Sequence, residues 1–537
     1  SAVDPARLFD KEGIGSAYQL FSAFAHPDLS SEFLWRVAKL SLESLLIGIL
    51  ATGLAVVVGF FLALIAIKVP TLPDAPGESH WTSGLAWGAR FLARGILGIT
   101  RAIPAIVWAY LFVRTIGLGP GAAVLAIAVS TGGIVGKLYA ELAEAVDPET
   151  IHALRRAGCG RLSILVFGVL PSVWRQWLSY SLFRLECSIR SASILGIVGA
   201  GGLGAEIALS VRYFEFDKLA TILMAVLVFV VLIEILGSIL RTKPLRWTVS
   251  VALSGSLLAL VYLDIPWSEI SLSQVLPDWL FSGGSTDTAA FVRRTLWLTG
   301  ETLAMAWSAT MIAALIALTV SPLAATTFSL RSHNREAVRG GGLLSSLSWF
   351  GFLATRLFLQ ICRAMPELTL ALVFVVWVGP GAFAGFLAIA LHTVGVLGRL
   401  YTDVYEEVEP KSVTALESAG SGRLGVWLYG VLPQVFPKLL AFTLDRFEVN
   451  VRATAMIGFV GAGGLGDEIH TAISLFHGRD LVMLLAIMIA VVTILDLIGD
   501  RVRHRLLTAR FVNRRGNQAI KPGGGIAMPG AKRGTGN

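Results

Sequence analysis

Charged residues are scarce in this chain of 537 residues, and their scarcity restricts the class of protein. Asp, Glu, Lys and Arg make up 15% of the residues and hydrophobic residues 55%, whereas soluble domains carry about 25% charged residues. Only three cysteines occur, and none of their spacings matches a zinc site, which argues against metal or redox chemistry. Such a chain has too little polar surface to cover a water-soluble protein. The composition therefore predicts a protein embedded in a membrane.

Several apolar runs reach the roughly 20 residues that cross a bilayer core. The clearest are 45–67, 219–240, 302–320 and 481–499. The formal net charge of +8 comes from basic residues in loops and in the C-terminal segment, which indicates positive flanks on one membrane face and not nucleic-acid binding. Residues 1–39 lack the basic-then-apolar pattern of a cleaved signal, so we expect them to form a tail.

One short motif would suggest a nucleotide-binding enzyme. Residues 199–204 read Gly-Ala-Gly-Gly-Leu-Gly, which matches the GxGxxG pattern of dinucleotide sites. That pattern is informative only between a strand and a helix, with an acidic residue about 20 positions later. Here it follows an apolar helical run. A glycine-rich reversal at the end of a span is the better interpretation.

The same hexapeptide recurs at residues 461–466, an offset of 262 (461 minus 199). This offset also relates residues 101–104 to 363–366 and residues 169–171 to 431–433. Matches in one register predict a duplication, in which each half holds the same five core spans. We expect them near residues 43–67, 91–114, 121–143, 176–198 and 219–240, and again near 301–320, 353–377, 381–404, 438–460 and 481–499.

Two five-span units in tandem would face opposite ways, because an odd number of crossings leaves the chain on the far side. The apolar run 247–263 supplies an extra crossing that makes the halves parallel. The predicted fold is an all-α polytopic membrane protein of about 11 spans, with tandem parallel repeats of five core spans joined by one span. Basic loops then place the N-terminus outside and the C-terminus in the cytoplasm, with any pathway between the halves. The predicted division is an N-terminal extracytoplasmic tail at 1–39, a first repeat at 40–242, a linking span and extracytoplasmic linker at 243–292, a second repeat at 293–505 and a basic, Gly-rich cytoplasmic tail at 506–537.

Two loops, at 147–171 and 409–433, contain the same caps and helix breakers. In each, an acidic residue and a proline open a short helix, a glycine closes it, and a second segment ends at proline. These loops resemble the EAA loop of bacterial ABC importer permeases, which reads Glu-Ala-Ala, three residues, Gly, nine residues, then Ile-x-Leu-Pro. The matching residues are Ala153, Gly158, Leu170 and Pro171, and Ala415, Gly420, Leu432 and Pro433. The chain departs from the pattern at the leading acid (His152, Thr414), at the second alanine (Leu154, Leu416) and at the isoleucine (Gly168, Gly430).

Residues 446–454 and 458–466, with 363–368 and 391–395, are similar to phosphonate-type importer permeases. The resemblance covers residues 40–240 and 295–505. It implies the type I ABC importer transmembrane fold, a multi-pass location in the plasma (inner) membrane and transport of a phosphonate or a related phosphorus oxyanion (phosphate, phosphite). It also implies that one copy of this chain works with two copies of an ABC ATPase subunit, which bind ATP and Mg, and with an extracytoplasmic substrate-binding protein. The chain itself lacks a Walker A motif, so we expect no cofactor and no enzymatic activity in it.

Charged residues inside the predicted fourth spans are candidates for the translocation pathway. At mid-bilayer a charged side chain costs about 2.5 to 3.5 kcal/mol on insertion scales, so it is normally paired or functional. Glu186 and Arg190 stand four residues apart and are expected to pair within the helix, as are Glu448 and Arg452. The remaining arginines could bind an oxyanion through two donors, or could only lock one span to another. The full set of pathway candidates is Arg184, Glu186, Arg190, Arg446, Glu448, Arg452, Arg101, Arg363 and His392.

Some of these candidates have simpler readings. Arg101 and Arg363 precede a proline and mark either a gate or a static kink. His392 aligns with Ser130, and a hydrogen-bonded core histidine is favoured over a ligand. Glu234 and Asp496, also 262 apart, are expected to contact a basic loop.

The glycine-rich loops are the predicted gates, because in the resembling family such a loop dips into the translocation path beneath the binding protein. A packed turn between spans is the alternative. The gate glycines are Gly199, Gly201, Gly202 and Gly204, and Gly461, Gly463, Gly464 and Gly466.

Three other functions stay open at this stage. An ABC permease could carry another small solute, such as methionine or an osmolyte. An ion-coupled secondary transporter of two helical halves would leave the paired loops unexplained. A membrane enzyme would need a reactive set of residues, which the repeats do not supply.

Overall fold

The computed structural model describes residues 22–67, 80–263, 287–326, 342–408 and 410–519, with a few isolated positions outside these ranges. Within them the chain is helical and contains no strand. Much of the predicted N-terminal tail, of the linker and of the C-terminal tail lies outside the described residues. The boundaries predicted for these segments therefore stay predictions.

The first half runs from α2 to α10. Its helices are α2 (Ser31–Ala66), α3 (His80–Ala102), α4 (Ala105–Ile116), α5 (Pro120–Glu144), α6 (Pro148–Arg156), α7 (Arg161–Ser163), η2 (Ile164–Val169), α8 (Leu170–Leu195), η3 (Gly196–Val198), α9 (Leu203–Arg212) and α10 (Phe216–Thr242). The linking helix α11 (Leu245–Tyr262) follows.

The second half repeats this order. Its helices are α13 (Thr288–Ala324), α15 (Gly342–Ala364), α16 (Glu367–Val378), α17 (Ala382–Glu406), α18 (Pro410–Ser418), α19 (Arg423–Gly425), η6 (Val426–Val431), α20 (Leu432–Ile457), η7 (Gly458–Val460), α21 (Leu465–Ser474) and α22 (Gly478–Ala519). The starts of α3 and α15 lie 262 apart (342 minus 80), as do those of α10 and α22 (478 minus 216). The predicted tandem repeat is confirmed helix by helix.

Six of the described helices are long and apolar enough to cross a membrane: α2, α5, α10, α13, α17 and α22. Three more candidate spans are bent pairs: α3 with α4, α15 with α16, and the segment 164–198 with α9. Helix α11 is apolar but shorter, and α20 is 26 residues long but carries several charges. These helices together account for the predicted segments, and the all-α polytopic fold class is confirmed.

The second core segment of each half is not the single straight span that the apolar run suggested. It breaks between α3 and α4 with a bend of 91°, and between α15 and α16 with a bend of 92°. Each break falls at a proline, Pro104 or Pro366, which lacks an N–H group and disfavours helical geometry in the residue before it.

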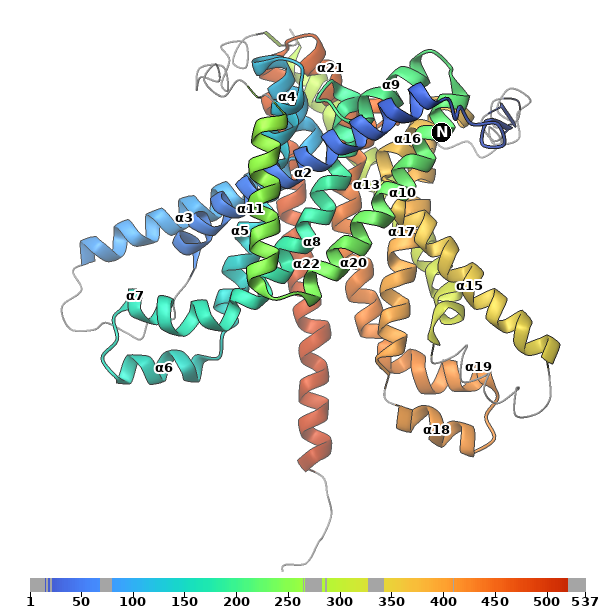
Figure 1. Cartoon of the computed structure of the whole chain (residues 1–537). Helices are drawn as coiled ribbons and strands as arrows, with labels where there is room; N and C mark the ends of the chain where they lie inside the picture. Colours follow the sequence, from blue (N-terminus) through green and yellow to red (C-terminus); the bar gives the residue numbers. More distant parts are fainter. Residues whose placement is uncertain are drawn as a thin grey trace, which may run out of the picture.

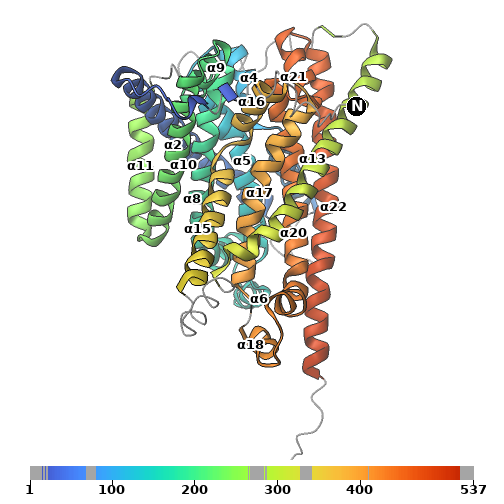
Figure 2. The same ribbon diagram turned by 90° about the vertical axis from the view of Figure 1, so that its right-hand side faces the viewer.

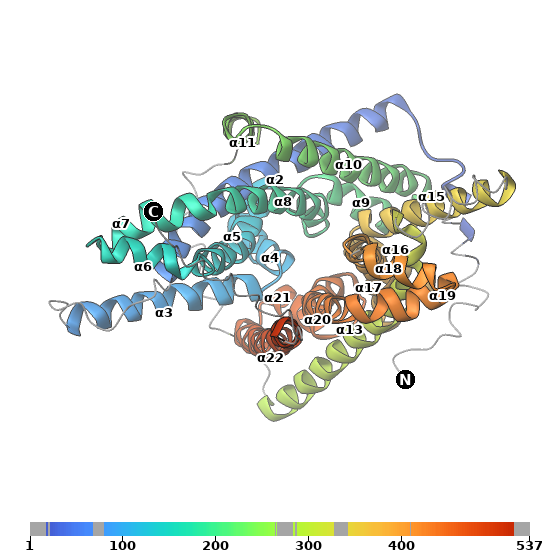
Figure 3. The same cartoon turned by 90° about the horizontal axis from the view of Figure 1, so that it is seen from below.

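The two halves face the same way. Figure 1 shows the short helices α6 and α18 at one end of the molecule and α9 and α21 at the other, and Figure 2 shows the same separation from a second direction. Helix α2 begins at the end that holds α9, whereas α22 extends past the end that holds α6 and α18 (Figure 1). Seen from that end, α6 and α18 lie on opposite sides of the molecule (Figure 3).

Apolar packing joins the halves. Helix α3 packs on α22 and α10 packs on α15, so each half contacts the other through a second and a last core segment. A buried apolar core includes side chains of both halves, among them Phe112 and Phe459. Any site on the facing helices therefore lies at an interface between two repeats.

Candidate functional site

The short helices α6 and α18 are closed by the same device. The Asp147 carboxylate accepts a hydrogen bond from the Glu149 N–H at the start of α6 (3.1 Å). The turn after Arg156, the last residue of α6, contains Gly158, whose φ of +81° lies in the left-handed region and whose N–H donates to the Arg155 carbonyl (2.9 Å). Gly420 follows α18 in the same way, with φ +83°. Glycine adopts this conformation at the least cost, so both loops are built as fixed shapes.

In each loop, the leucine that replaces alanine in the EAA pattern lies against the glycine that replaces isoleucine. A Cβ atom on Gly168 would lie 2.6 Å from Leu154 Cδ1, and one on Gly430 would lie 2.7 Å from Leu416 Cδ1. The leucine that replaces alanine in each short helix therefore fills the volume that the family's isoleucine would occupy. The short helix stays packed against the π-helical turn that precedes α8 or α20.

This packing predicts the effect of restoring the family residue. In Gly168→Ile the new side chain collides with Leu154, and such overpacking costs about 1 to 3 kcal/mol. We expect α6 to separate from η2, so that limited proteolysis cleaves residues 157–163 faster than in the parent chain. The double variant L154A/G168I removes the collision and should restore the parent cleavage rate. Equal rates for the parent and the single variant would contradict the packing.

The loops also expose apolar side chains that sequence reasoning missed. Phe167 and Tyr429 are 73% and 79% exposed, and Leu162 and Leu424 are 74% and 70% exposed. Each pair is related by the repeat offset of 262, which is the signal that could have found them. Of the eight EAA-type residues, Ala153, Ala415, Gly158 and Gly420 are exposed, as are Pro171 and Pro433, while Leu170 and Leu432 are half-buried.

The glycine-rich loops lie at the opposite end of α8 and α20, beside α9 and α21 (Figure 1). Gly199, Gly201 and Gly202 have φ between +74° and +88°, and Gly461, Gly463 and Gly464 repeat this geometry. Each loop is fixed to its neighbour, because the Gly119 N–H donates to the Gly199 carbonyl (3.1 Å) and Gly381 to Gly461 (2.8 Å). Gly204 and Gly466 allow backbone contact, since a Cβ would lie 2.7 Å from the Ile194 carbonyl oxygen and 2.3 Å from that of Ala455. A helix, and not a strand, precedes each loop, so the GxGxxG match is a sharp reversal.

The first helix of each half holds its glycine-rich loop through residues that sequence reasoning missed. Ser44 Oγ accepts a hydrogen bond from the Leu203 N–H (3.0 Å), and Thr302 Oγ1 accepts one from the Leu465 N–H (2.9 Å). Glu43 also accepts from the Gly202 N–H (3.2 Å). The offset here is 258 (302 minus 44), because the chain between the first and second helices is four residues longer in the second half. A search at 258 would have aligned Glu43-Ser44 with Glu301-Thr302.

Two ion pairs join the halves in a reciprocal manner. Arg101, at the end of α3, pairs with Asp496 on α22, and Arg363, at the end of α15, pairs with Glu234 on α10. The two arginines are 262 residues apart, as are the two acids. Each arginine therefore pairs with the acid of the opposite half. The expectation that Glu234 and Asp496 contact a basic loop is wrong, because each acid meets the kinked segment of the opposite half.

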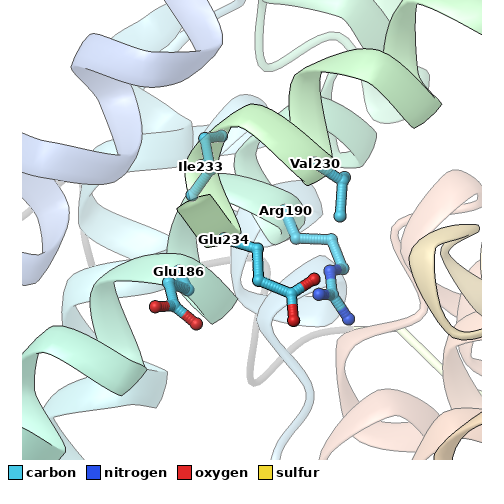
Figure 4. Close-up of a pocket in the computed structure, with 5 residues that line it drawn as sticks. All are labelled: Glu186, Arg190, Val230, Ile233 and Glu234. Carbon is cyan, nitrogen blue, oxygen red and sulfur yellow. The ribbon is translucent and has the colours of Figure 1, made fainter. Parts of the chain in front are cut away.

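The predicted pairing of Glu186 with Arg190 is also wrong. Glu186 Oε1 lies 2.8 Å from Arg241 Nη1 on α10. Arg190 instead lies beside Glu234, and Figure 4 shows the Glu186 carboxylate pointing away from it. The Arg190 guanidinium also donates to the Arg363 carbonyl (3.5 Å), which brings it to the interface. The small pocket that these groups line has room for about one water molecule, so it is not a preformed oxyanion cavity in this conformation.

Two further pathway candidates, His392 and Arg446, lie close to Glu367. His392 is 6% exposed, and its Nε2 lies 3.7 Å from Glu367 Oε2, while its Nδ1 lies 2.9 Å from the Met365 carbonyl oxygen. The guanidinium groups of Arg446 and Arg190 are close enough to act on the Glu367 carboxylate. The sequence had not singled out Glu367 as a functional residue.

The Arg452 guanidinium is close enough to interact electrostatically with Asp496, Arg101 and Glu448. Glu448 is buried in α20. The Nε atom of Arg184, on α8, is buried and lacks a hydrogen-bond partner among the described residues.

An aromatic contact joins the halves at the end that holds the glycine-rich loops. The Tyr110 ring, on α4, stacks on His470 of α21 with centroids 5.4 Å apart and meets the edge of Phe459 at 5.7 Å. The Tyr110 hydroxyl lies 2.9 Å from Ser474 Oγ. The two halves are thus closed on each other at this end.

Comparison with known proteins decides the family. The model of the family described as "Binding-protein-dependent transport system inner membrane component" matches residues 84–244 and 337–508, one segment in each half. The chain belongs to this family of transport permeases. Its two matched segments make it a fusion of two permease units in one polypeptide.

Similar proteins include the phosphate-import permease protein PhnE of Mycolicibacterium smegmatis, which is 29% identical over 496 residues, or 88% of this chain and 86% of that protein. The phosphite transport system permease protein PtxC of Stutzerimonas stutzeri is 31% identical over 229 residues, or 43% of this chain and 78% of that protein. Among solved structures, an inward-facing form of the MetNI methionine ABC transporter is 20% identical and covers 41% of this chain and 99% of its own, with a TM-score of 0.35. As a member of the family whose model matches both halves, the chain is a multi-pass membrane protein and a transport subunit.

Proposed function

We propose that the chain forms both membrane-spanning halves of an ATP-binding-cassette importer that carries a phosphorus oxyanion, namely phosphate, phosphite or a phosphonate, into the cytoplasm. The observation that supports this most strongly is the pair of like-facing short helices α6 and α18 on one chain (Figure 1). Two relatives are named as a phosphate-import permease and a phosphite transport permease, and these names support the substrate class.

The paired helices imply the stoichiometry of the complex. Each of α6 and α18 docks on one copy of a separate ATPase subunit, and one copy of this chain serves two. The exposed apolar residues Phe167 and Tyr429 lie beside these helices and extend the docking face. ATP and Mg bind in those partner subunits.

The glycine-rich loops occupy the end that receives a substrate-binding protein. With α6 and α18 in the cytoplasm, α9, α21 and the start of α2 lie outside, which agrees with the distribution of basic loops. Closure of the ATPase pair moves α6 and α18 together, and the contact between Tyr110 and His470 separates as the outer end opens. The charged residues of α8 and α20 then line the path between the halves.

The test is uptake by the assembled importer. The full chain is reconstituted in liposomes with a partner ATPase and a substrate-binding protein, and labelled phosphate, phosphite, methylphosphonate or L-methionine is supplied. We expect ATP-dependent uptake of at least one phosphorus oxyanion. Uptake of methionine alone would mean that the permease carries a different solute. Uptake without ATP would favour an ion-coupled transporter.

A further inference from the structure

Arg94 on α3 joins the ends of two other helices of the first half. Its Nε donates to the Ala66 carbonyl at the end of α2 (3.0 Å), and its Nη2 pairs with Glu144, the last residue of α5. A helix C-terminus has free carbonyl groups and a partial negative charge, so an arginine is a favourable partner there. Helix α6 begins four residues after Glu144 (148 minus 144), so this contact lies at its base.

The second half contains the same contact. Arg356 on α15 donates from Nε to the Ala324 carbonyl at the end of α13 (3.0 Å), and its Nη2 lies 2.8 Å from Oε1 of Glu406, the last residue of α17. Helix α18 begins four residues later (410 minus 406). Both helices that dock on the ATPase in the proposed function therefore start beside an ion pair, and we call Arg94–Glu144 and Arg356–Glu406 the basal pairs.

The helix that holds each basal pair is also tied to the opposite half. Arg101 follows Arg94 by seven residues, or about two helical turns, so both arginines lie on one side of α3. Arg101 pairs with Asp496 on α22 of the second half. On α15, Arg363 follows Arg356 by seven residues and pairs with α10 of the first half. Each of α3 and α15 thus joins the base of its own docking helix to the last core helix of the other half, and we call α3 and α15 the bridging helices.

Each bridging helix is in backbone contact with the helix that leads to its docking helix. A Cβ atom on Gly133 of α5 would lie 2.8 Å from the Arg101 N atom, and one on Gly395 of α17 would lie 2.4 Å from the Arg363 N atom. Small residues allow such close approach between helices in membranes. Because close packing leaves no free space between the two backbones, we expect α3 to move with α5, and α15 to move with α17.

The last core helices lead to the outer end of the molecule. Helix α22 packs on α21, and α10 packs on α9. Helix α21 carries His470 and Ser474, which contact Tyr110 where the two halves close on each other. A displacement of α22 therefore reaches this outer contact.

A second route connects each docking helix to the outer end of its own half. It runs from α6 through η2 and α8 to the glycine-rich loop, and likewise from α18 through η6 and α20. A π-helical turn interrupts each of these routes at 164–169 and 426–431. Helices bend at such turns, so the route through the bridging helix is the stiffer one.

We propose that the bridging helices transmit motion across the pseudo-two-fold axis, so that each docking helix acts on the outer end of the opposite half. Movement of α6 passes through α5 and α3 to α22 and α21, and movement of α18 passes through α17 and α15 to α10 and α9. Glu144 and Glu406 are positioning residues that act through the arginines they hold. The inference rests on the proposed function and adds which half each ATPase subunit moves.

Glu144→Gln tests the first basal pair, because it removes the charge with little change in size. The full chain is reconstituted with a partner ATPase and a substrate-binding protein, and the solute used is whichever of labelled phosphate, phosphite, methylphosphonate and L-methionine the parent carries. We expect uptake per ATP hydrolysed to fall about fivefold, which corresponds to about 1 kcal/mol. The rate of ATP hydrolysis and the midpoint of thermal unfolding should stay close to the parent values, which a loss of structure alone would not allow.

Two further variants control for the charge itself. The exchange R94E/E144R should recover part of the loss, because the ion pair returns while the hydrogen bond to the Ala66 carbonyl does not. Glu141→Gln is the matched control, since it removes an i,i+4 pair with Lys137 that lies within α5 (3.3 Å). Such pairs contribute little, so uptake per ATP should stay within about twofold of the parent.

Pairs of variants test whether the motion crosses between the halves. Arg101→Gln breaks the far end of the first bridging helix, and Arg363→Gln breaks the far end of the second. Changes within one continuous link are not additive, so E144Q/R101Q should be no worse than the poorer of its two single variants. Changes in separate links are additive in free energy, so the losses in E144Q/R363Q should multiply.

Parent-like uptake per ATP in the Glu144→Gln variant would overturn the inference, as would the reverse pattern in the two double variants. A parent that carries methionine alone would refute the proposed substrate class, and the same variants would still test the bridging helices with methionine. Parent uptake without ATP would refute both the proposed function and the inference. The failure of one is therefore distinguishable from the failure of the other.

Discussion

Replacing Gly158 with proline is expected to reduce uptake at least about tenfold while the chain still inserts and folds. Proline requires φ near −65°, whereas Gly158 has φ +81°, and its N–H donates to the Arg155 carbonyl. The turn that follows α6 must then change its backbone conformation, and a residue held in an unfavourable φ/ψ region costs about 1 to 3 kcal/mol. Because each tenfold change corresponds to about 1.4 kcal/mol, coupling through this helix should fall at least about tenfold. The measurements are uptake and ATP hydrolysis stimulated by the binding protein.

Gly420→Pro should have the same effect, because α18 carries the same closure with φ +83°. The matched control is Gly158→Asn, since asparagine tolerates left-handed geometry and a Cβ at this position meets no atom within 4 Å. We expect the asparagine variant to transport like the parent. Normal coupled uptake in both proline variants would mean that α6 and α18 do not transmit ATPase motion.

Much of the fold was predictable because the chain is duplicated, so the same helix breakers and motifs occur at equivalent positions in both halves. Arg101-Ala102-Ile103-Pro104 and its copy at 363–366 fixed the register, and the two proline-ended loops fixed the facing of the halves. Because five crossings leave the chain on the far side of the membrane, parallel halves required one more span, which is α11. The bends at Pro104 and Pro366 were indicated as kinks, but their size was not, because a kink angle depends on tertiary packing.

The partners of intramembrane charges were not predictable in the same way. Helical spacing identifies neighbours on one helix, so it favoured Glu186 with Arg190, whereas the structure gives Glu186 a partner on α10, Arg241. Glu234 has its partner, Arg363, in the other half, which only the parallel packing of the repeats brings near. Ser44 was missed because the first helices of the two halves are related by an offset of 258 and not 262.

The reciprocal ion pairs predict a second large effect, on the association of the halves. Arg101→Ala removes the ion-pair partner of Asp496, which is 9% exposed, and leaves Arg452 as the cation near its carboxylate. Breaking a buried pair costs about 3 to 5 kcal/mol, and the nearby Arg452 puts the expected loss at the lower end of this range. We expect a lower midpoint of thermal unfolding for the purified chain and loss of uptake, because α3 is then released from α22.

Exchange of the two charges tests whether the pair itself is responsible. The double variant R101D/D496R should recover part of the lost stability, whereas D496R alone places two guanidinium groups together and should be worse than Arg101→Ala. Arg399→Ala is the control, since its i,i+4 pair with Asp403 is about half exposed and such pairs contribute only about 0.3 to 0.5 kcal/mol. The pair would be excluded as the link between the halves if Arg101→Ala unfolded at the parent temperature, or if the exchange gave no recovery.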